Sequence, residues 1–487
     1  MVLAALRFVR VLSGAAALCG VGCSLAWSVG CSEPSSTTPG LSTGGTPPSP
    51  AGASAAAAPS LPPVAGGASS SSEGPGPGLP LSGGAAEAAG QAGGPSAAVV
   101  PLSNDSGAIT PKALVGLPPR ADVLAALRLA NDQFAGKWPD PTIDVVTDRV
   151  RPSNLHTRAV YYEGLMALYA VETDAQRKAQ YYEYAVRWGS SPSHPWQVTN
   201  GDVTTVNADS QACGQPYLAL YAIEPEPVRI QQIEASIRNM LASGNTTAWT
   251  WIDALHMAMP VFAGLGVLRN DPAFFEGMWG LYAHSRNTEG GGLLDAATGL
   301  WWRDADYTPD ATYIRSPSGE SVYWSRGNGW VLAALARVLE ALPANEPHRP
   351  TYEADFRALA AAVVPLQRAD GFWSSSLTLP NHCQSAGQPG EDGPETTGTS
   401  LFTYGLGWGI RRGLLDPAVY GPVLVKAWNG MVDVALRDDG FVGFMQSTGS
   451  APCSSPGPLG AGVAPNFEDL GLGCFLLAGS EVAQLSP

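Results

Sequence analysis

The chain has 487 residues and a formal net charge of −15, which together narrow the classes of function. A strongly acidic protein is a poor partner for nucleic acid, because phosphate backbones bind basic surfaces. The charge does not exclude an anionic sugar, since one arginine in a pocket can pair with one carboxylate whatever the overall charge. The composition also changes along the chain, which indicates separate segments.

Residues 1–31 have the layout of a bacterial export signal. Arg7 and Arg10 precede an apolar run at 11–21, for which a single-pass membrane anchor is the alternative. Cys31 stands where the lipid-modified cysteine of a lipoprotein would begin the mature chain, but Ser28 replaces the usual aliphatic residue, so lipid-anchored and free forms both stay open. We expect export to the periplasm or cell envelope, with no transmembrane span in the mature chain.

Two further segments follow the export signal. Residues 32–118 consist mainly of Gly, Ala, Ser and Pro and cannot bury enough apolar surface to offset the entropy of ordering them, so we predict a flexible tether. Residues 119–487 are rich in Trp, Tyr, Leu and Ala and are long enough for one large core. We predict a single folded domain there, in a monomeric protein.

About twelve segments of this domain have the apolar spacing of helices, and we find no alternating pattern of strands. They are 119–135, 156–170, 173–188, 207–223, 226–242, 248–268, 271–285, 323–341, 350–367, 396–412, 417–436 and 466–482. Every second segment, beginning with 156–170, is apolar nearly all round, whereas the segments between them have polar faces. Helices that are apolar on all sides must be enclosed. We therefore predict an all-α toroid of alternating outer and inner helices, six pairs in all.

Two connections carry the same turn signal, Asp-Gly followed by an aromatic residue. They are 370–373 and 439–441, with 291–295 as a looser version. We place them at one mouth of the toroid, with the aromatic side chains closing over its rim. Chance turns are the alternative.

Unusual polar residues fall at the N-terminal ends of the inner helices. They are Asp209, Asp253, Trp324, Arg326, Asn328, Trp330, Glu395, Thr396, Asn466 and Glu468. Six helix N-termini that point into one bowl present partial positive charge to it. That arrangement favours an anionic ligand.

Asp253 has the surroundings of a general acid. Its sequence neighbours are apolar: Trp249, Trp251, Leu255 and Met257. Desolvation raises the pKa of a carboxyl group and lets it hold a proton near neutral pH. The alternative is that Asp253 merely caps its helix by accepting backbone N–H bonds, and the same alternative holds for Asp209.

Trp324 and Trp330 lie on either side of Arg326 in the segment Trp-Ser-Arg-Gly-Asn-Gly-Trp. Tryptophan faces can stack on sugar rings, and an arginine between them can pair with a carboxylate. The alternative is that one of the two tryptophans belongs to the core. The three residues are candidates for substrate binding.

The remaining reactive residues form no recognisable site. The six histidines show no metal-ligand spacing and no triad-like acidic partner, and no phosphate-binding loop is present. Cys383 and Cys453 lie in loop-like surroundings and could form a disulfide in an oxidising compartment, with two unpaired thiols as the alternative. We predict neither a metal nor a cofactor.

Two segments, Trp251–Pro260 and Trp324–Val331, resemble the hallmark segments of the unsaturated uronyl hydrolases of glycoside hydrolase families 88 and 105. The resemblance extends over nearly all of the chain after Pro119. It implies an (α/α)6 barrel, in agreement with the alternating helices. It also implies removal of a 4,5-unsaturated uronic acid from the non-reducing end of oligosaccharides made by a polysaccharide lyase, without a cofactor.

The family reaction hydrates an enol ether. An aspartic acid protonates C4, water adds at C5, and the resulting hemiketal opens and releases the remaining sugar. Matching residue by residue gives the acid/base role to Asp253 and the second active-site carboxylate to Asp209. Three further residues, Trp324, Arg326 and Trp330, match substrate-contacting positions. Tyr162 matches an aromatic residue on the first inner helix and is a further candidate for substrate binding, as is Arg303.

The sequence departs from the family pattern at two positions. Arg303 stands where rhamnogalacturonyl hydrolases have a histidine after paired aromatic residues, which leaves the reaction intact but the sugar specificity open. His256 replaces a commoner aromatic residue and either tunes the pKa of Asp253 or packs beneath it. The competing functions are another enzyme on the same barrel, namely a polysaccharide lyase or an inverting hydrolase, and a non-catalytic sugar-binding lipoprotein.

Overall fold

The computed structural model describes residues 113–144, 150–309, 315–316, 319–379, 394–446, 448–449, 452 and 468–487. All of them belong to one compact unit, residues 93–487, while residues 1–92 form the other unit of the chain. The predicted export signal with Cys31 and the tether up to residue 112 lie outside the described residues, as do Cys383, Cys453 and Asn466. What the sequence predicts for them stays a prediction.

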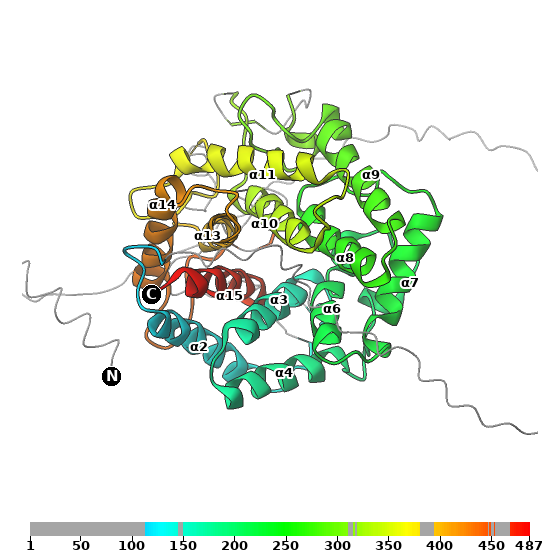
Figure 1. Cartoon of the computed structure of the whole chain (residues 1–487), viewed down its shortest axis with the longest axis horizontal. Helices are drawn as coiled ribbons and strands as arrows, with labels where there is room; N and C mark the ends of the chain where they lie inside the picture. The colour runs from blue at the N-terminus through cyan, green and yellow to red at the C-terminus, as the bar shows by residue number, and fades with distance from the viewer. Residues whose placement is uncertain are drawn as a thin grey trace, which may run out of the picture. The chain divides into compact units, whose positions relative to one another are not determined.

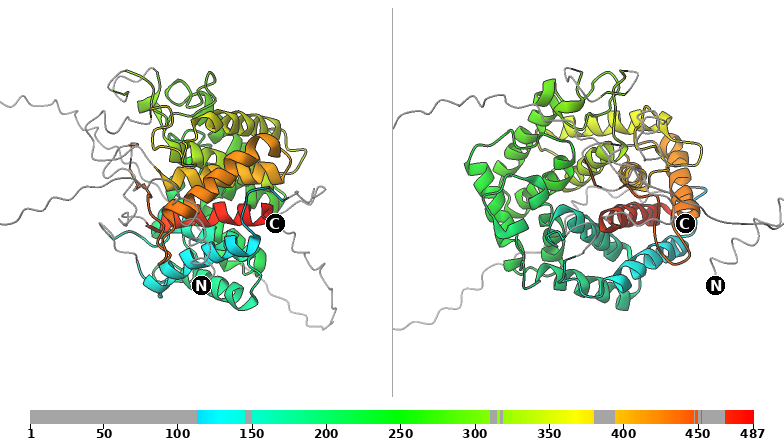
Figure 2. Two further views of the ribbon diagram at one scale, coloured as in Figure 1. Left: turned by 90° about the vertical axis from the view of Figure 1, so that its left-hand side faces the viewer. Right: turned by 180° about the vertical axis from the view of Figure 1, so that it is seen from behind.

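Helices arranged in two concentric rings make up the described unit (Figure 1). The inner ring consists of α3 (His156–Val171), α6 (Gly214–Ile223), α8 (Asp253–Arg269), α10 (Ser325–Ala341), α13 (Thr396–Arg411) and α15 (Glu468–Leu485). The outer ring consists of α2 (Arg120–Lys137), α4 (Ala175–Gly189), α7 (Val228–Ala242), α9 (Ala273–Asn287), α11 (Arg349–Val363) and α14 (Pro417–Gly430). Figure 2 shows from behind how the outer helices surround the inner ones.

The contacts between helices close the inner ring. Each inner helix touches the next one along the chain, and α15 completes the circle against α3. Each outer helix packs mainly on one inner helix, beginning with α2 on α15 and α4 on α3. In the part of the chain that the structure describes, isolated β-bridges occur but no strand. The prediction of an (α/α)6 barrel is confirmed.

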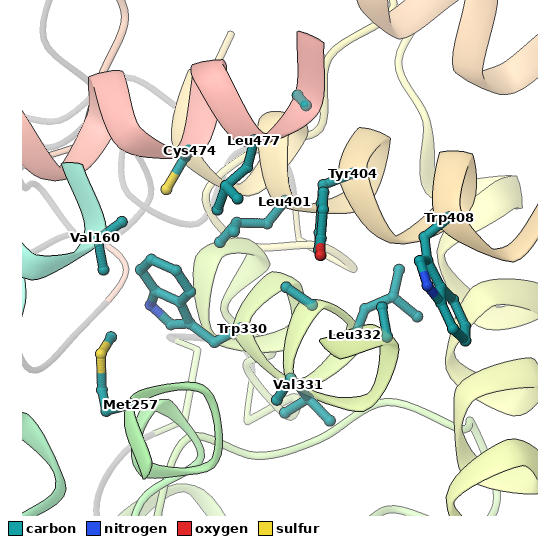
Figure 3. Close-up of a cluster of buried hydrophobic side chains, with 14 of the residues drawn as sticks. Val160, Met257, Trp330, Val331, Leu332, Leu401, Tyr404, Trp408, Cys474 and Leu477 are labelled. Atoms are coloured by element: carbon teal, nitrogen blue, oxygen red, sulfur yellow. The ribbon is translucent and has the colours of Figure 1, made fainter. Parts of the chain in front are cut away.

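The inner helices are apolar all round because side chains from opposite sides of the ring meet inside it. Figure 3 shows Val160 of α3, Met257 of α8, Trp330 of α10, Leu401 of α13 and Leu477 of α15 in one buried cluster. A residue in this ring faces either the cluster or an outer helix. No position on an inner helix is therefore left for a solvated polar stripe.

Helices α3 and α15 approach each other so closely that only glycine fits at their crossing. A Cβ atom added to Gly164 would collide with the backbone of Gly473, and one added to Gly473 would collide with the backbone of Val160. The missing side chains allow the last inner helix to contact the first. The closure of the barrel depends on these two glycines.

The bounds of two inner helices differ from those that the apolar pattern of the sequence predicts. Helix α8 begins at Asp253 and not near 248, because the preceding residues pair with another segment: Ile252 N–H donates to the carbonyl of Arg303 at 2.9 Å. The predicted helix 207–223 is divided into α5 (Ala208–Gln211) and α6. Pro216 lacks the N–H group that would continue the hydrogen-bond ladder.

The two Asp-Gly turns are structurally equivalent. Gly371 and Gly440 both have positive φ, 93° and 90°, and each turn leads from an outer helix to the next inner helix, α11 to α13 and α14 to α15. Both turns therefore lie at the mouth formed by the N-terminal ends of the inner helices, as predicted. Phe372 and Trp373 are completely buried, so the expectation that the aromatic residues of this turn close over the rim is wrong.

The folded unit begins slightly before Pro119. The backbone N–H of Leu114 donates to the carbonyl of Leu485 at 2.9 Å, and Leu117 is buried. The last residues of the predicted tether thus pack on the barrel. Among the helices described, none is both long and apolar enough to cross a membrane.

Candidate active site

Five charged or titratable side chains meet at the mouth of the barrel. His156 is the first residue of α3, Asp209 belongs to α5, Asp253 is the first residue of α8, Arg303 lies between α9 and α10, and Arg326 is in the first turn of α10. The other four all act electrostatically on the ionisation of Asp253. Segments far apart in the sequence thus place two carboxylates, two guanidinium groups and one imidazole around one position.

Asp253 holds its proton more firmly than an ordinary aspartic acid. Burial raises the pKa of its carboxyl group and Asp209 adds to the rise, while Arg303, Arg326 and His156 oppose it. Atom Oδ2 is buried and has no hydrogen-bond partner among the described residues. The N-cap position of α8 is occupied by Ile252. The alternative of a simple helix cap therefore does not describe Asp253.

Asp209 is also not a cap. Asn207 occupies the N-cap position of α5 and accepts from the N–H of Ser210 at 3.2 Å. The Asp209 carboxylate instead faces the imidazole of His156, with Oδ2 3.4 Å from Nδ1, and 29% of the Asp209 side chain is exposed. Asp209 is thus a partly accessible carboxylate, and His156 is its direct neighbour.

Arg303 is held beside Asp253 by the backbone. Its carbonyl accepts from Ile252, the residue before Asp253, and Trp251 forms an isolated β-bridge with Asp304. The Arg303 guanidinium pairs with the Asp304 carboxylate, while its Nε atom has no hydrogen-bond partner within the described part of the chain. The guanidinium has donors to spare for an anionic ligand.

Arg326 and Trp324 are fixed by a residue that the sequence did not single out. The Arg326 guanidinium lies over the Trp324 ring at 4.6 Å and donates from Nη1 to the backbone oxygen of Gln446 at 3.0 Å. The Trp324 indole N–H donates to the side-chain oxygen of Gln446 at 2.6 Å. Gln446 follows the Asp439–Phe441 turn, so its position after an Asp-Gly signal was the one clue in the sequence.

The pKa of Arg326 is lowered by burial, against the opposing attraction of Glu395 and Asp253. Glu395 caps α13, where it accepts from the N–H groups of Thr397 and Gly398, both at 2.7 Å. It also accepts from the hydroxyl of Ser325 at 3.2 Å. Arg326 is thus a buried cation that lies within electrostatic reach of both Glu395 and Asp253.

Two predicted substrate contacts belong to the core. Trp330 is buried in the cluster of Figure 3, and its ring centroid lies 4.5 Å from that of His256. Tyr162 has no exposed surface and stacks on Trp188 at 4.0 Å. Neither side chain offers a surface to a sugar, so the expectation for both is corrected. Trp324 is equally buried, at 1% exposed, but lies outside the hydrophobic core cluster, so the alternative in which one of the two tryptophans is core describes Trp330.

His256 packs beneath the site. Its Nε2 atom lies 2.9 Å from a carboxylate oxygen of Glu163, and both side chains are completely buried. His256 is not among the main groups that shift the pKa of Asp253. Of its two interpretations, the packing role fits the structure. Within the described ranges, no group of His, Cys, Asp and Glu side chains could hold a metal ion, and Cys213 and Cys474 are free and buried.

Comparison with known proteins identifies a family whose sequence model matches this chain. The family model described as Glycosyl Hydrolase Family 88 matches residues 131–486. An unsaturated 3S-rhamnoglycuronyl hydrolase from Formosa agariphila is 37% identical over 246 residues, 50% of this chain and 60% of its own length. A protein of the same description from an Alteromonas species is 34% identical over 235 residues, 48% of this chain and 51% of its own length. The matches thus span only part of these relatives.

Solved structures match over more of the chain. A glycosyl hydrolase family 88 protein from Bacteroides vulgatus has a TM-score of 0.65 and 28% identity, covering 76% of this chain and 100% of its own. A protein described as a polysaccharide lyase has a TM-score of 0.64 and 30% identity, covering 75% and 97%. A family 105 glycoside hydrolase from C. acetobutylicum, at 18% identity and a TM-score of 0.56, shares the fold.

Proposed function

Because the chain belongs to glycosyl hydrolase family 88, we propose that it removes a 4,5-unsaturated uronic acid from the non-reducing end of lyase-generated oligosaccharides. The reaction is hydration of the C4=C5 double bond. A proton added to C4 leaves positive charge at C5 and the ring oxygen, water adds at C5, and the hemiketal opens to release the remaining sugar. No cofactor takes part in these steps.

The observation that carries this proposal is the state of Asp253. A carboxyl group whose pKa is raised by burial keeps its proton to higher pH than an ordinary aspartic acid and can deliver it to carbon. Its Oδ2 atom has no hydrogen-bond partner in the described structure, so this oxygen is not engaged elsewhere. The double bond of the substrate would lie against the carboxyl group.

The two arginines supply the reason for an acidic sugar. C5 of an unsaturated uronic acid carries a carboxylate, one bond from the reacting atoms. Arg303 and Arg326 both act on Asp253, so a sugar placed with C4 at Asp253 has its carboxylate within the field of both guanidinium groups. They would bind the substrate and set which carbon faces the acid.

The test follows the ultraviolet absorbance of the unsaturated sugar. The purified protein is expected to bleach the absorbance of oligosaccharides made by a lyase. Asp253→Asn should abolish the bleaching and retain sugar binding, whereas Asp132→Asn, at an exposed ion pair with Arg177, should behave like the wild type. Full activity of the Asp253→Asn protein would refute the assignment.

A polysaccharide lyase reaction is the second candidate function. Its support is the solved structure of similar fold that is described as a polysaccharide lyase. The direction of the absorbance change in the same assay distinguishes the two functions. A lyase creates the double bond, so absorbance rises when saturated polysaccharide is supplied. A hydrolase removes the bond, so absorbance falls when lyase products are supplied. The raised pKa of Asp253 favours the hydrolase, because protonation of carbon requires an acid.

We further propose that the preferred substrates are lyase products in which the unsaturated uronic acid is joined to rhamnose. These should be assayed first. The support is the name of the two curated relatives, unsaturated 3S-rhamnoglycuronyl hydrolase. A panel should compare them with pectin, arabinogalactan and glycosaminoglycan products at equal concentration. A tenfold or larger kcat/KM for a rhamnose-free product would reject this preference.

Export and a monomeric state are also proposals, supported by the pattern of residues 1–31 and by the single barrel of the described unit. Cell fractionation of the wild type and a Cys31→Ala variant would test the anchor: a lipoprotein should move from the membrane fraction to the soluble fraction. Light scattering of the purified protein would test the monomer, and a dimeric mass would reject it.

A further inference from the structure

His156 is the residue of the site that neither the sequence pattern nor the proposed acid explains. It begins α3, and its Nδ1 atom lies 3.4 Å from Oδ2 of Asp209, with 19% of the imidazole side chain exposed. The Nδ1 atom is buried and has no hydrogen-bond partner within the described ranges, so its contact with Asp209 is electrostatic. The ring therefore faces a carboxylate with Nδ1 and is otherwise partly exposed.

The charged groups around the ring come from four other segments. Asp209 faces it from α5, and Asp253, at the start of α8, feels its charge together with the charges of Arg303 and Arg326. The imidazole and the Asp253 carboxyl group thus lie close enough at the barrel mouth to interact electrostatically. Figure 1 shows α3 and α8 on the inner ring with α6 between them.

We propose that His156 is a catalytic residue, the general base that deprotonates the water added at C5, with Asp209 as its positioning partner. This inference rests on the proposed function. An imidazole whose Nδ1 faces a carboxylate presents Nε2 as the proton acceptor, and the carboxylate stabilises the imidazolium that forms. The separation of acid and base on different helices lets the two proton transfers occur on different sides of the sugar.

Protons and electrons balance in the proposed reaction. The electron pair of the C4=C5 bond takes the proton of Asp253, which forms a C4–H bond and leaves a carboxylate. The water oxygen forms a bond to C5, and one water proton moves to Nε2 of His156. Water has then been added across the double bond. The proton on His156 returns to Asp253 through solvent at the mouth, which restores both groups.

The experiment compares His156→Gln, His156→Ala and Asp209→Asn with a matched control, His284→Gln. His284 also pairs with a carboxylate, Glu289 at 3.0 Å, but lies on α9 outside the site. We expect His156→Gln to lower kcat by about 100-fold or more, with KM changed less than about threefold and the acid-side limb of the kcat pH profile lost. Free imidazole should restore saturable activity to His156→Ala.

Asp209→Asn should lower kcat as well, and its effect should not multiply with that of His156→Gln, because the pair acts as one unit. Unchanged kcat in His156→Gln, or a change in KM alone with an intact acid limb and no imidazole rescue, would overturn the base role. A wild type that never consumes the double bond would overturn the proposed function, and the base role with it, before any variant is compared.

Discussion

Replacement of Asp253 by Asn should abolish activity and stabilise the fold near neutral pH. In the native protein the pKa of Asp253 is raised above its ordinary value of 3.8, chiefly by burial. A group with a raised native pKa stabilises the fold fully below its unfolded-state pKa, and this contribution is lost as pH rises through the native value. Asn stays neutral throughout, so it avoids that loss.

The size of the effect follows from the shift. Each unit by which the pKa is raised corresponds to about 1.4 kcal/mol, and the attraction of Arg303 and Arg326 is already included in the net rise. Urea unfolding of both proteins from acid to neutral pH should show the free energies of unfolding diverging as pH increases above the ordinary carboxyl value. A variant that is less stable than the wild type near neutral pH, or a difference independent of pH, would refute the reasoning.

Three further changes test other parts of the site. Arg303→Ala removes a positive charge that lowers the pKa of Asp253, so KM for the anionic sugar should rise and the basic limb of the kcat/KM profile should move to higher pH, as measured by the absorbance assay. Trp330→Ala should destabilise the fold by about 3–5 kcal/mol in urea unfolding, because the ring is buried. Gln446→Leu leaves the buried indole N–H of Trp324 unpaired, which should cost about 1–3 kcal/mol in the same measurement.

Each of these three predictions would be contradicted by a specific result. An unmoved basic limb in Arg303→Ala would place Arg303 outside the field of Asp253. A near-neutral free energy of unfolding for Trp330→Ala, with a raised KM, would return Trp330 to the sugar site. Wild-type stability of Gln446→Leu would mean that water reaches the Trp324 indole.

The barrel was predictable because its two rings differ in hydrophobic pattern. An inner helix such as α13 is enclosed on every side and must be apolar all round, while an outer helix such as α4 keeps a polar face. Capping was less predictable. Asn207 rather than Asp209 caps α5, and Ile252 rather than Asp253 precedes α8, because the backbone of 251–252 pairs with 303–304 and delays the start of the helix.

Trp324 and Trp330 look alike in the sequence and are equally buried, each 1% exposed, so only their partners distinguish them. Trp324 and Trp330 flank the same arginine, but Trp324 donates to Gln446 at the mouth whereas Trp330 lies in the core cluster. Along a helix, six residues amount to nearly two turns, enough to take a side chain from the mouth into the ring. The spacing in the sequence gives the distance between the two tryptophans. It does not tell which of them lies at the mouth.

The amino-acid sequence by itself determined the alternating helices, the mouth at which their N-terminal ends meet, and Asp209, Asp253, Arg303 and Arg326 as candidates for its chemistry. The tertiary structure alone decided that His156 faces Asp209, that Gln446 holds Trp324 and Arg326, and that Tyr162 and Trp330 are core. The physical reason is that periodicity records burial along one helix. Hydrogen bonds and charge interactions between different helices depend on the closed ring that brings them together.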